Sequence, residues 1–141
     1  MEHHLTTYIT HDTLISALGF GTQENLEAIR SYHSGITLQT DKRIADTPLL
    51  AATLSQERLQ QQAEAIGVSD YPRMEQLFIL TINELIRQSG QTLEDKTCGL
   101  ILSTTKGNID LLARHTEHPD EAVFLWKMAE NIAGYFHAEE R

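Results

Sequence analysis

The sequence predicts an α/β fold in one domain of 141 residues, or in a piece of one. Two segments have the composition of strands: 5–16 is rich in Thr, Ile and Tyr, and 97–104 is a continuous apolar run. Helical segments follow each of them, and no repeat, low-complexity stretch or linker divides residues 1–141. A strand, a glycine-rich turn and a helix therefore open the chain, as in an α/β protein.

The composition excludes several classes of protein. Apolar residues make up 40% and charged residues 22% of the chain, as in a soluble globular protein. The formal charge is −9 and the basic residues form no stripe, which argues against nucleic acid and against an anionic membrane surface as partners. No apolar run has the length of a membrane span and the first residues lack a signal-peptide pattern, so we expect a cytoplasmic protein. The single cysteine excludes an intrachain disulfide framework.

Short strands and helices are expected in the first half. The glycines of ALGFG end the strand at 5–16, and Thr22 is the expected N-cap of a helix that Gly35 ends in the left-handed conformation. The segment ITLQT, at 36–40, alternates like a short strand. Residues 48–54, PLLAATL, are compatible with a strand or a helix, and periodicity alone does not decide between them.

Two further helices have clear boundaries. Ser55 is the N-cap of the first and Gly67 follows it, while Pro72 suits the first helical position of the second and Gly90 its end. Apolar residues point in every direction around this second helix, at Leu77, Phe78, Ile79, Leu80 and Ile82. A helix that is apolar all round must be covered on more than one side, which indicates a partner or further sequence.

The last third contains the strand at 97–104, a polar turn and two helices. We expect this strand to be buried on both faces, because it is apolar without alternation. One helix follows the turn at Ile109, and another covers 119–136 with Asp120 and Glu121 in an acidic first turn. The apolar stripe expected on the last helix consists of Ala122, Leu125, Trp126, Ala129, Ile132, Ala133 and Phe136.

The polar turn is the candidate ligand site. It consists of Ser103, Thr104, Thr105, Lys106, Gly107 and Asn108. Loops of this composition at the end of a strand commonly hold a ligand, and their backbone N–H groups can meet an anion. The order is not that of a Walker A loop, in which the lysine follows the second glycine. A plain polar turn before a helix explains the same residues, so both interpretations stay open.

No other segment supplies a catalytic constellation. Cys98 opens the apolar strand without a base nearby in sequence, as an inert core cysteine does. His115 and His118, with Glu117 and Asp120, have the spacing of a metal site but also the composition of a solvated connection. No nucleophile elbow, Cys-x-x-Cys pair or His-Glu-x-x-His helix occurs. We expect no catalytic residue, no metal and no cofactor.

Three blocks of this sequence are similar to three segments of a known protein family and occur in the same order. The first is YITHDTLISALGFGTQENLEAIRSYHSGI, and its fitting positions are Ser16, Leu18, Gly19, Glu24, Asn25, Ala28, Ser34, Gly35 and Ile36. The second is RMEQLFILTINELIRQSGQTL, and the third is CGLILSTTKGNIDLL, a strand with its loop. Together they resemble the N-terminal part of the β-ketoacyl-acyl-carrier-protein synthases, the condensing enzymes of fatty-acid and polyketide synthesis. The Thr-Thr-Lys-Gly-Asn run in the third block looks like that of a divergent branch of this family.

This resemblance implies a thiolase-like fold, with two similar halves in five layers and usually a dimer. The chain would be the N-terminal portion, a mixed sheet with flanking helices, and the helix at 72–90 would be covered by sheets or by a second subunit. The parent would be a 3-oxoacyl-ACP synthase, an acyltransferase that condenses an acyl thioester with malonyl-acyl carrier protein. Its Cys nucleophile and its two His, or His and Asn, lie beyond the third block. Cys98 does not match that nucleophile, so we expect the chain alone to be inactive.

The resemblance also gives the candidate loop a role. Residues 103–108 would help to wall the acyl pocket near the dimer interface, with Thr105 at the position that varies with the acyl chain. Lys106 and Asn108 stand where small or apolar residues are usual. The implied partners are acyl carrier protein and an acyl thioester in the parent, and a homo-oligomer or a ketosynthase partner subunit. Arg73 is the basic residue that the second block offers to the carrier protein.

Two other functions stay open. A ketosynthase-like subunit without catalysis would bind an active partner through the same apolar helix. A small α/β domain would instead bind an anion at the 103–108 loop, and that binding would depend on Lys106.

Overall fold

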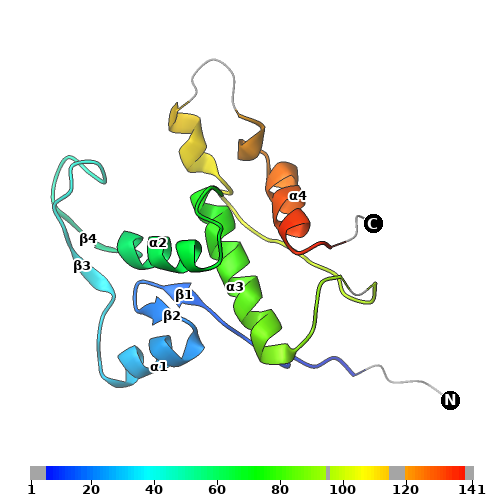
Figure 1. The fold of residues 1–141 in the computed structure, drawn as a ribbon. Helices are drawn as coiled ribbons and strands as arrows, with labels where there is room; N and C mark the ends of the chain where they lie inside the picture. Colours follow the sequence, from blue (N-terminus) through cyan, green and yellow to red (C-terminus); the bar gives the residue numbers. More distant parts are fainter. Residues whose placement is uncertain (1–5, 95, 115–119, 139–141) are drawn as a thin grey trace.

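The computed structural model describes residues 6–94, 96–114 and 120–138, and Figure 1 shows their arrangement. The elements are β1 (Ile15–Ser16), β2 (Gly19–Phe20), α1 (Thr22–Arg30), β3 (Ile36–Gln39), β4 (Leu49–Ala52), α2 (Gln56–Ala65), α3 (Arg73–Ser89), η1 (Ile109–Arg114), η2 (Glu121–Val123) and α4 (Leu125–Tyr135). The mixed α/β class is confirmed. The strands of the described residues form two separate antiparallel pairs, β1–β2 and β3–β4, so the mixed sheet that the resemblance implies is not present in them.

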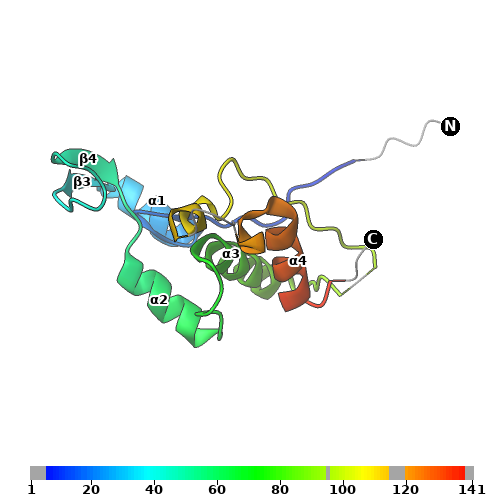
Figure 2. The same cartoon turned by 90° about the horizontal axis from the view of Figure 1, so that it is seen from above.

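The core lies around α3, between α2 and α4, and α4 runs beside α3 in both views (Figures 1 and 2). Its buried residues are Ala63, Val68, Ile79, Ile82, Met128, Ile132 and Phe136. On α3 the buried row is Glu75, Ile79 and Ile82, which follows the i, i+4, i+7 spacing of one helix face. None of the helices that the described residues form is long and apolar enough to cross a bilayer.

The two central helices agree with the sequence prediction. Ser55 caps α2, because its Oγ accepts a hydrogen bond from the Arg58 backbone N–H at 3.2 Å. Gly90 ends α3 in the left-handed conformation with φ of 69°. Pro72 lies one position earlier than expected, at the N-cap. Leu77 and Leu80 remain half-buried, so the described residues cover α3 incompletely.

The prediction of a strand at 5–16 is wrong in extent. Only Ile15 and Ser16 pair, with Phe20 and Gly19 across a tight hairpin. Residues 6–14 form no strand, and residue 5 lies outside the described residues. Within the described part of the chain, residues 6–11 make no backbone hydrogen bond. They have the composition of a strand but no strand to pair with.

The prediction of a strand at 97–104, buried on both faces, is also wrong. Residues 98–104 have no regular secondary structure, and among the described residues 98–103 make no backbone hydrogen bond. Burial alternates instead: Leu100 and Leu102 pack against the core, while Ile101 is 94% exposed. The segment therefore has the side-chain alternation of a strand with one covered face.

The first helix begins and ends differently from the prediction. Thr22 is its first residue, and Gly21 holds the N-cap position with φ of 111°. The helix ends before Gly35: Ser31 is the C-cap, and Tyr32 takes the left-handed conformation with φ of 58°. Asn25 is the residue that α1 buries, so this helix is held by a polar side chain.

The β1–β2 hairpin is organised by Asn25. Its Nδ2 donates to the carbonyl oxygens of Gly21 at 2.8 Å and Gly19 at 3.0 Å, and its Oδ1 accepts from the Ser16 hydroxyl. The Ser16 hydroxyl oxygen in turn accepts from the Leu18 N–H at 3.0 Å. One buried amide thus binds both the Gly19 carbonyl of the hairpin and the Gly21 carbonyl at the start of α1.

An ion pair joins α1, which follows this hairpin, to α2. Arg58 donates from both terminal nitrogens to Glu24, at 2.7 and 3.0 Å, and its guanidinium lies 4.9 Å from the centre of the Phe20 ring. Glu24 also accepts from the Phe20 backbone N–H at 2.7 Å. The Arg58 hydrogen bonds and then the Phe20 N–H lower the pKa of Glu24.

The β3–β4 ribbon projects away from the helices in both views (Figures 1 and 2). It confirms the strand expected at 36–40 and decides the ambiguous segment 48–54 in favour of a strand, with Leu38 opposite Leu50. Both of these side chains are exposed.

The last helix is shorter than predicted. Glu121 belongs to η2, which Asp120 caps through a 3.1 Å hydrogen bond from the Ala122 N–H, and Pro119 lies outside the described residues. Phe124 is extended and separates η2 from α4. The buried row of α4 is Met128 and Ile132, continued by Phe136, whereas Leu125 and Trp126, which the expected stripe included, are exposed.

Candidate functional site

The 103–108 loop is closed by one of its own hydroxyl groups. Thr104 Oγ1 accepts hydrogen bonds from the backbone N–H groups of Gly107 at 3.0 Å and Lys106 at 3.3 Å. Gly107 has φ of 55°, and a Cβ there would lie 2.6 Å from Leu125 Cδ2. These two N–H groups are therefore engaged within the loop and do not point at an external anion.

The six predicted residues divide between surface and interior. Ser103, Thr105 and Lys106 are exposed, and Thr104 is half-buried. Gly107 and Asn108 are buried. Instead of the helix expected after the loop, η1 follows as a 3-10 helix, with the Leu111 N–H bonded to the Asn108 carbonyl at 3.0 Å. The outer side of the loop is thus available to a ligand, and the inner side anchors the loop to the rest of the fold.

The anchor is a buried carboxylate. Asn108 Nδ2 donates to Glu75 Oε1 at 2.7 Å and to the Ala122 carbonyl at 2.8 Å. Asn131 Nδ2 lies 3.2 and 3.3 Å from the two Glu75 oxygens. We call Glu75, Asn108 and Asn131 the Glu75 cluster. It joins α3, the loop and α4, which are far apart in sequence.

The surroundings of Glu75 act on its protonation in opposite directions. Burial raises its pKa, and this is the largest effect. The hydrogen bonds from Asn108 and Asn131, and then the positive charge of Lys127, oppose that rise. Among the described residues, Asn108 Oδ1 is buried without a hydrogen-bond partner. The cluster is therefore incompletely satisfied.

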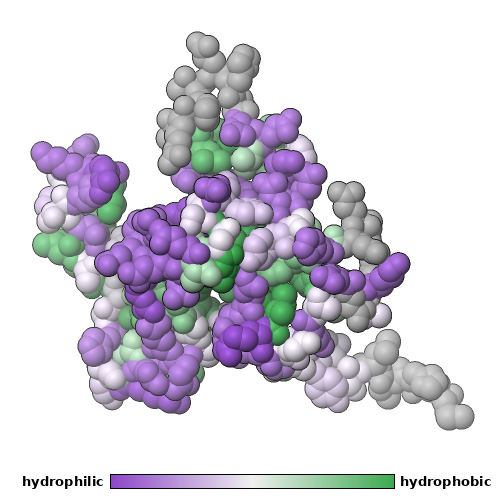
Figure 3. Space-filling model, in the orientation of Figure 1, coloured by the Kyte–Doolittle hydropathy of each residue, from purple (hydrophilic) through white to green (hydrophobic). Residues whose placement is uncertain are grey.

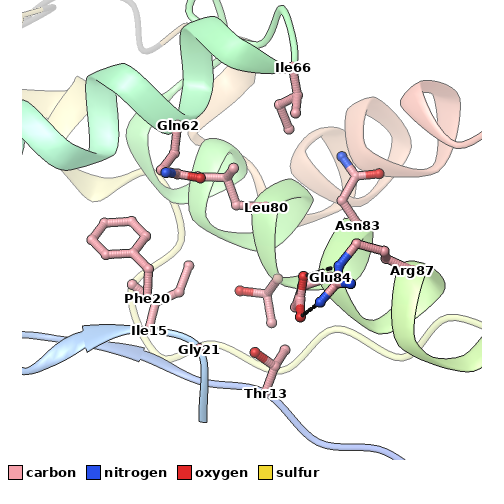
Figure 4. A pocket seen from close by; sticks show the side chains of 11 residues that line it. Thr13, Ile15, Phe20, Gly21, Gln62, Ile66, Leu80, Asn83, Glu84 and Arg87 are labelled. Atoms are coloured by element: carbon pink, nitrogen blue, oxygen red, sulfur yellow. Dashed lines mark hydrogen bonds and ion pairs between the residues drawn. The ribbon is translucent and has the colours of Figure 1, made fainter. Parts of the chain in front are cut away.

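A cavity of about 230 Å³ lies between the β1–β2 hairpin, α2 and α3, and Figure 4 shows the side chains that line it. Phe20, Leu80 and Ile66 give it apolar walls. Glu84 and Arg87 lie at one side, joined by hydrogen bonds of 2.6 and 2.8 Å, and this pairing lowers the pKa of Glu84 to about 2. The two charged groups are thus paired with each other, and uncharged polar side chains lie beside the apolar walls, at Thr13, Gln62, Thr81 and Asn83.

The remaining sequence candidates do not form a catalytic site within the described residues. Cys98 is half-buried, and no hydrogen bond links its thiol to a base there. Those residues contain no group of three or more His, Cys, Asp or Glu side chains that could hold a metal ion. His115 and His118, proposed from sequence as possible ligands, lie outside the described residues.

Comparisons of the chain with protein-family models, with curated proteins and with solved structures found no match.

Sequence reasoning missed Glu75 and Asn131. One signal for Glu75 was present, because it occupies the helix position four residues before Ile79, on the face that α3 buries. A charged residue on such a face needs partners, and an amide in a distant loop supplies one. The pairing of Asn108 with Glu75 spans 33 residues, so no local pattern indicates it.

Proposed function

We propose that this chain is the N-terminal part of a β-ketoacyl-acyl-carrier-protein synthase with a thiolase-like fold. The parent enzyme would condense an acyl thioester with malonyl-acyl carrier protein, with loss of carbon dioxide. The observation that carries the proposal is the unpaired state of residues 6–11 and 98–103, both of strand composition. In such an enzyme these segments would be strands of one half of the fold.

The side chains of these segments support the same proposal. Ile9 is 93% and Ile101 94% exposed, although both are strongly apolar. Exposed strand edges with apolar side chains pair readily with another strand. Figure 3 shows further apolar surface on the face of the molecule that Figure 1 presents: between polar patches across its middle, and on the β3–β4 ribbon. A larger sheet would cover much of this surface.

The resemblance also implies which parts of the enzyme this chain would supply and which would come from other sequence. This chain would contribute the 103–108 loop to the wall of the acyl pocket, with the exposed Thr105 facing outward. The nucleophilic Cys and the residues that assist decarboxylation would come from other sequence. The interior anchor of the loop at Asn108 gives such a wall a fixed position against α3.

The chain alone is expected to have no condensation activity, because it offers no thiolate with a base partner. The assay supplies a short acyl thioester and malonyl-acyl carrier protein to the purified chain and to Cys98→Ala. Both should give the background rate of decarboxylation and of product formation. A rate above background that Cys98→Ala abolishes would contradict the proposal that the catalytic residues lie outside this chain.

A non-catalytic ketosynthase-like subunit is the second candidate, and the same exposed apolar surface favours it. The two differ in what the chain binds. Co-purification of a stable, stoichiometric complex with an active ketosynthase would favour the subunit, whereas a part of one enzyme needs the remainder of its own domain.

The exposed face of 98–103 should make the chain self-associate. Light scattering should give a mass above that of one 15.9 kDa chain. Ile101→Asp should weaken association about tenfold, because it removes about 1.4 kcal/mol or more of apolar contact and adds charge. Ser103→Asp is the matched control: it adds the same charge at an exposed site two residues along and removes no apolar side chain. A monomeric wild-type chain would contradict the proposal.

A further inference from the structure

Two hollows adjoin beside the β1–β2 hairpin. The first is the 230 Å³ cavity between the hairpin, α2 and α3. The second is a cleft of about 540 Å³ between the hairpin, α1 and the C-terminal part of α3. The side chains and backbone of four residues line both hollows: Phe20, Gly21, Glu84 and Arg87. One ligand can therefore reach from the cavity into the cleft.

The cavity suits an apolar group of limited size. Its apolar walls are Ile15, Phe20, Ile66 and Leu80 (Figure 4). Two of its polar side chains are engaged with the protein itself. Thr81 donates to the Leu77 carbonyl at 2.7 Å. Asn83 Nδ2 donates to the Tyr135 hydroxyl at 3.4 Å. Apolar cavities of about 150 Å³ accept benzene, so this cavity of 230 Å³ has room for one aromatic ring or a short alkyl chain.

The cleft, in contrast, is acidic. Its carboxylates are Asp12, Glu24, Glu27 and Glu84. Arg58 pairs with Glu24 at 2.7 Å. Arg87 pairs with Glu84 at 2.6 Å, and this pair lies at one side of the cavity, with Phe20 at the other in Figure 4. Glu24 and Glu84 therefore have cation partners within the protein.

The other two carboxylates of the cleft have neutral partners. Asp12 Oδ2 accepts from the Thr22 hydroxyl at 2.7 Å. Glu27 Oε1 accepts from Gln23 Nε2, also at 2.7 Å. Within the described part of the chain, neither carboxylate belongs to an ion pair. Two negative charges are thus left unbalanced in the cleft beside the apolar cavity.

We propose that the two hollows form one binding site for a small organic cation, a primary amine whose alkyl chain or single ring fills the cavity and whose ammonium lies in the cleft near Asp12 and Glu27. The apolar walls select the body of the ligand, and the unbalanced carboxylates select the charge of its head. An alkyl carboxylate would add a third negative charge there, and an alcohol would leave the two charges unbalanced. This inference does not depend on the proposed function, because the 103–108 loop lines neither hollow.

The test is an NMR titration of the ¹⁵N-labelled full chain with three probes of one chain length: hexylammonium, 1-hexanol and hexanoate. Hexylammonium should bind with a dissociation constant of about 1 mM, about tenfold more tightly than hexanol, and hexanoate should bind most weakly. The backbone amide shifts should be largest at Gly21 and Thr81. Salt at about 0.5 M should bring the affinity for hexylammonium close to that for hexanol, because it screens the carboxylates.

A pair of charge variants tests the cleft. The double variant Asp12→Asn with Glu27→Gln keeps both hydrogen-bond acceptors and removes both charges. It should weaken hexylammonium about fivefold and leave hexanol unchanged. Glu57→Gln is the matched control, since it removes a charge from α2 at an exposed position that lines neither hollow, and it should leave both affinities unchanged.

A second pair of variants tests the cavity. Gln62 lines it from an exposed position of α2, so Gln62→Trp should fill it and weaken hexylammonium and hexanol alike, by about tenfold or more. Gln61→Trp is the matched control, because it places the same side chain on the same helix outside both hollows and should change neither affinity.

The comparison of the three probes on the wild-type chain decides the proposal even if a variant fails to fold. The site is overturned if hexanol or hexanoate binds as tightly as hexylammonium, or if the shifts arise away from the hairpin and α3. It is equally overturned if hexylammonium causes no shifts up to about 10 mM, a concentration tenfold above the expected dissociation constant.

Discussion

Asn25→Asp is expected to lower the free energy of unfolding by about 3 to 5 kcal/mol at neutral pH, the loss typical of a buried charge without compensation. The substitution keeps the size and shape of the side chain. It replaces the Nδ2 donor with a carboxylate oxygen, which would face the Gly21 and Gly19 carbonyl oxygens at 2.8 and 3.0 Å. Denaturant unfolding followed by circular dichroism measures the change.

The loss should depend on pH. Burial beside carbonyl oxygens raises the pKa of the introduced carboxyl, and its protonated form can donate to one carbonyl. The deficit should therefore shrink as the pH falls toward 4. Gln23→Glu makes the same amide-to-acid change at an exposed position of α1 and should alter stability by less than about 0.5 kcal/mol. A deficit of that small size in Asn25→Asp would mean that the amide does not organise the hairpin.

Ile132→Ala is expected to destabilise the protein by about 2 to 5 kcal/mol, the range for removing a buried aliphatic side chain. Ile132 is fully buried and belongs to the core cluster in which Ile79 of α3 lies. The change leaves a cavity between α3 and α4. Thermal and denaturant unfolding should both report it.

Two controls separate packing from helix formation. Ile132→Val should cost about 0.5 to 1.5 kcal/mol, since it removes one methylene group. Leu125→Ala removes a similar side chain from the same helix, but that side chain is 52% exposed, so the loss should be much smaller. Equal losses for Ile132→Ala and Leu125→Ala would contradict the buried row assigned to α4.

Elements with local signals were predictable from the sequence. Ser55 and Gly90 mark the limits of α2 and α3 because capping is a property of a few neighbouring residues. The hairpin strands β3 and β4 pair close in sequence, and periodicity predicted the first of them. The start of α4 was not predictable in the same way, because Phe124 is extended between two helical segments that share one apolar pattern.

Elements that need distant partners were not predictable. Residues 98–103 have the composition of a buried strand, but a strand exists only where another strand pairs with it. The 103–108 loop was predicted as a site, whereas its anchor was not, because Glu75 and Asn131 reach it from two other elements. Composition indicates that a loop is polar, and only the fold decides which of its side chains points inward.

The most direct test of the proposed ketosynthase assignment is to read the source DNA beyond the codon for Arg141. We expect the frame to continue into a strand, a turn and a helix that carry a cysteine, with histidines further on. A stop codon directly after Arg141, with no such segment nearby, would contradict the assignment to a condensing enzyme.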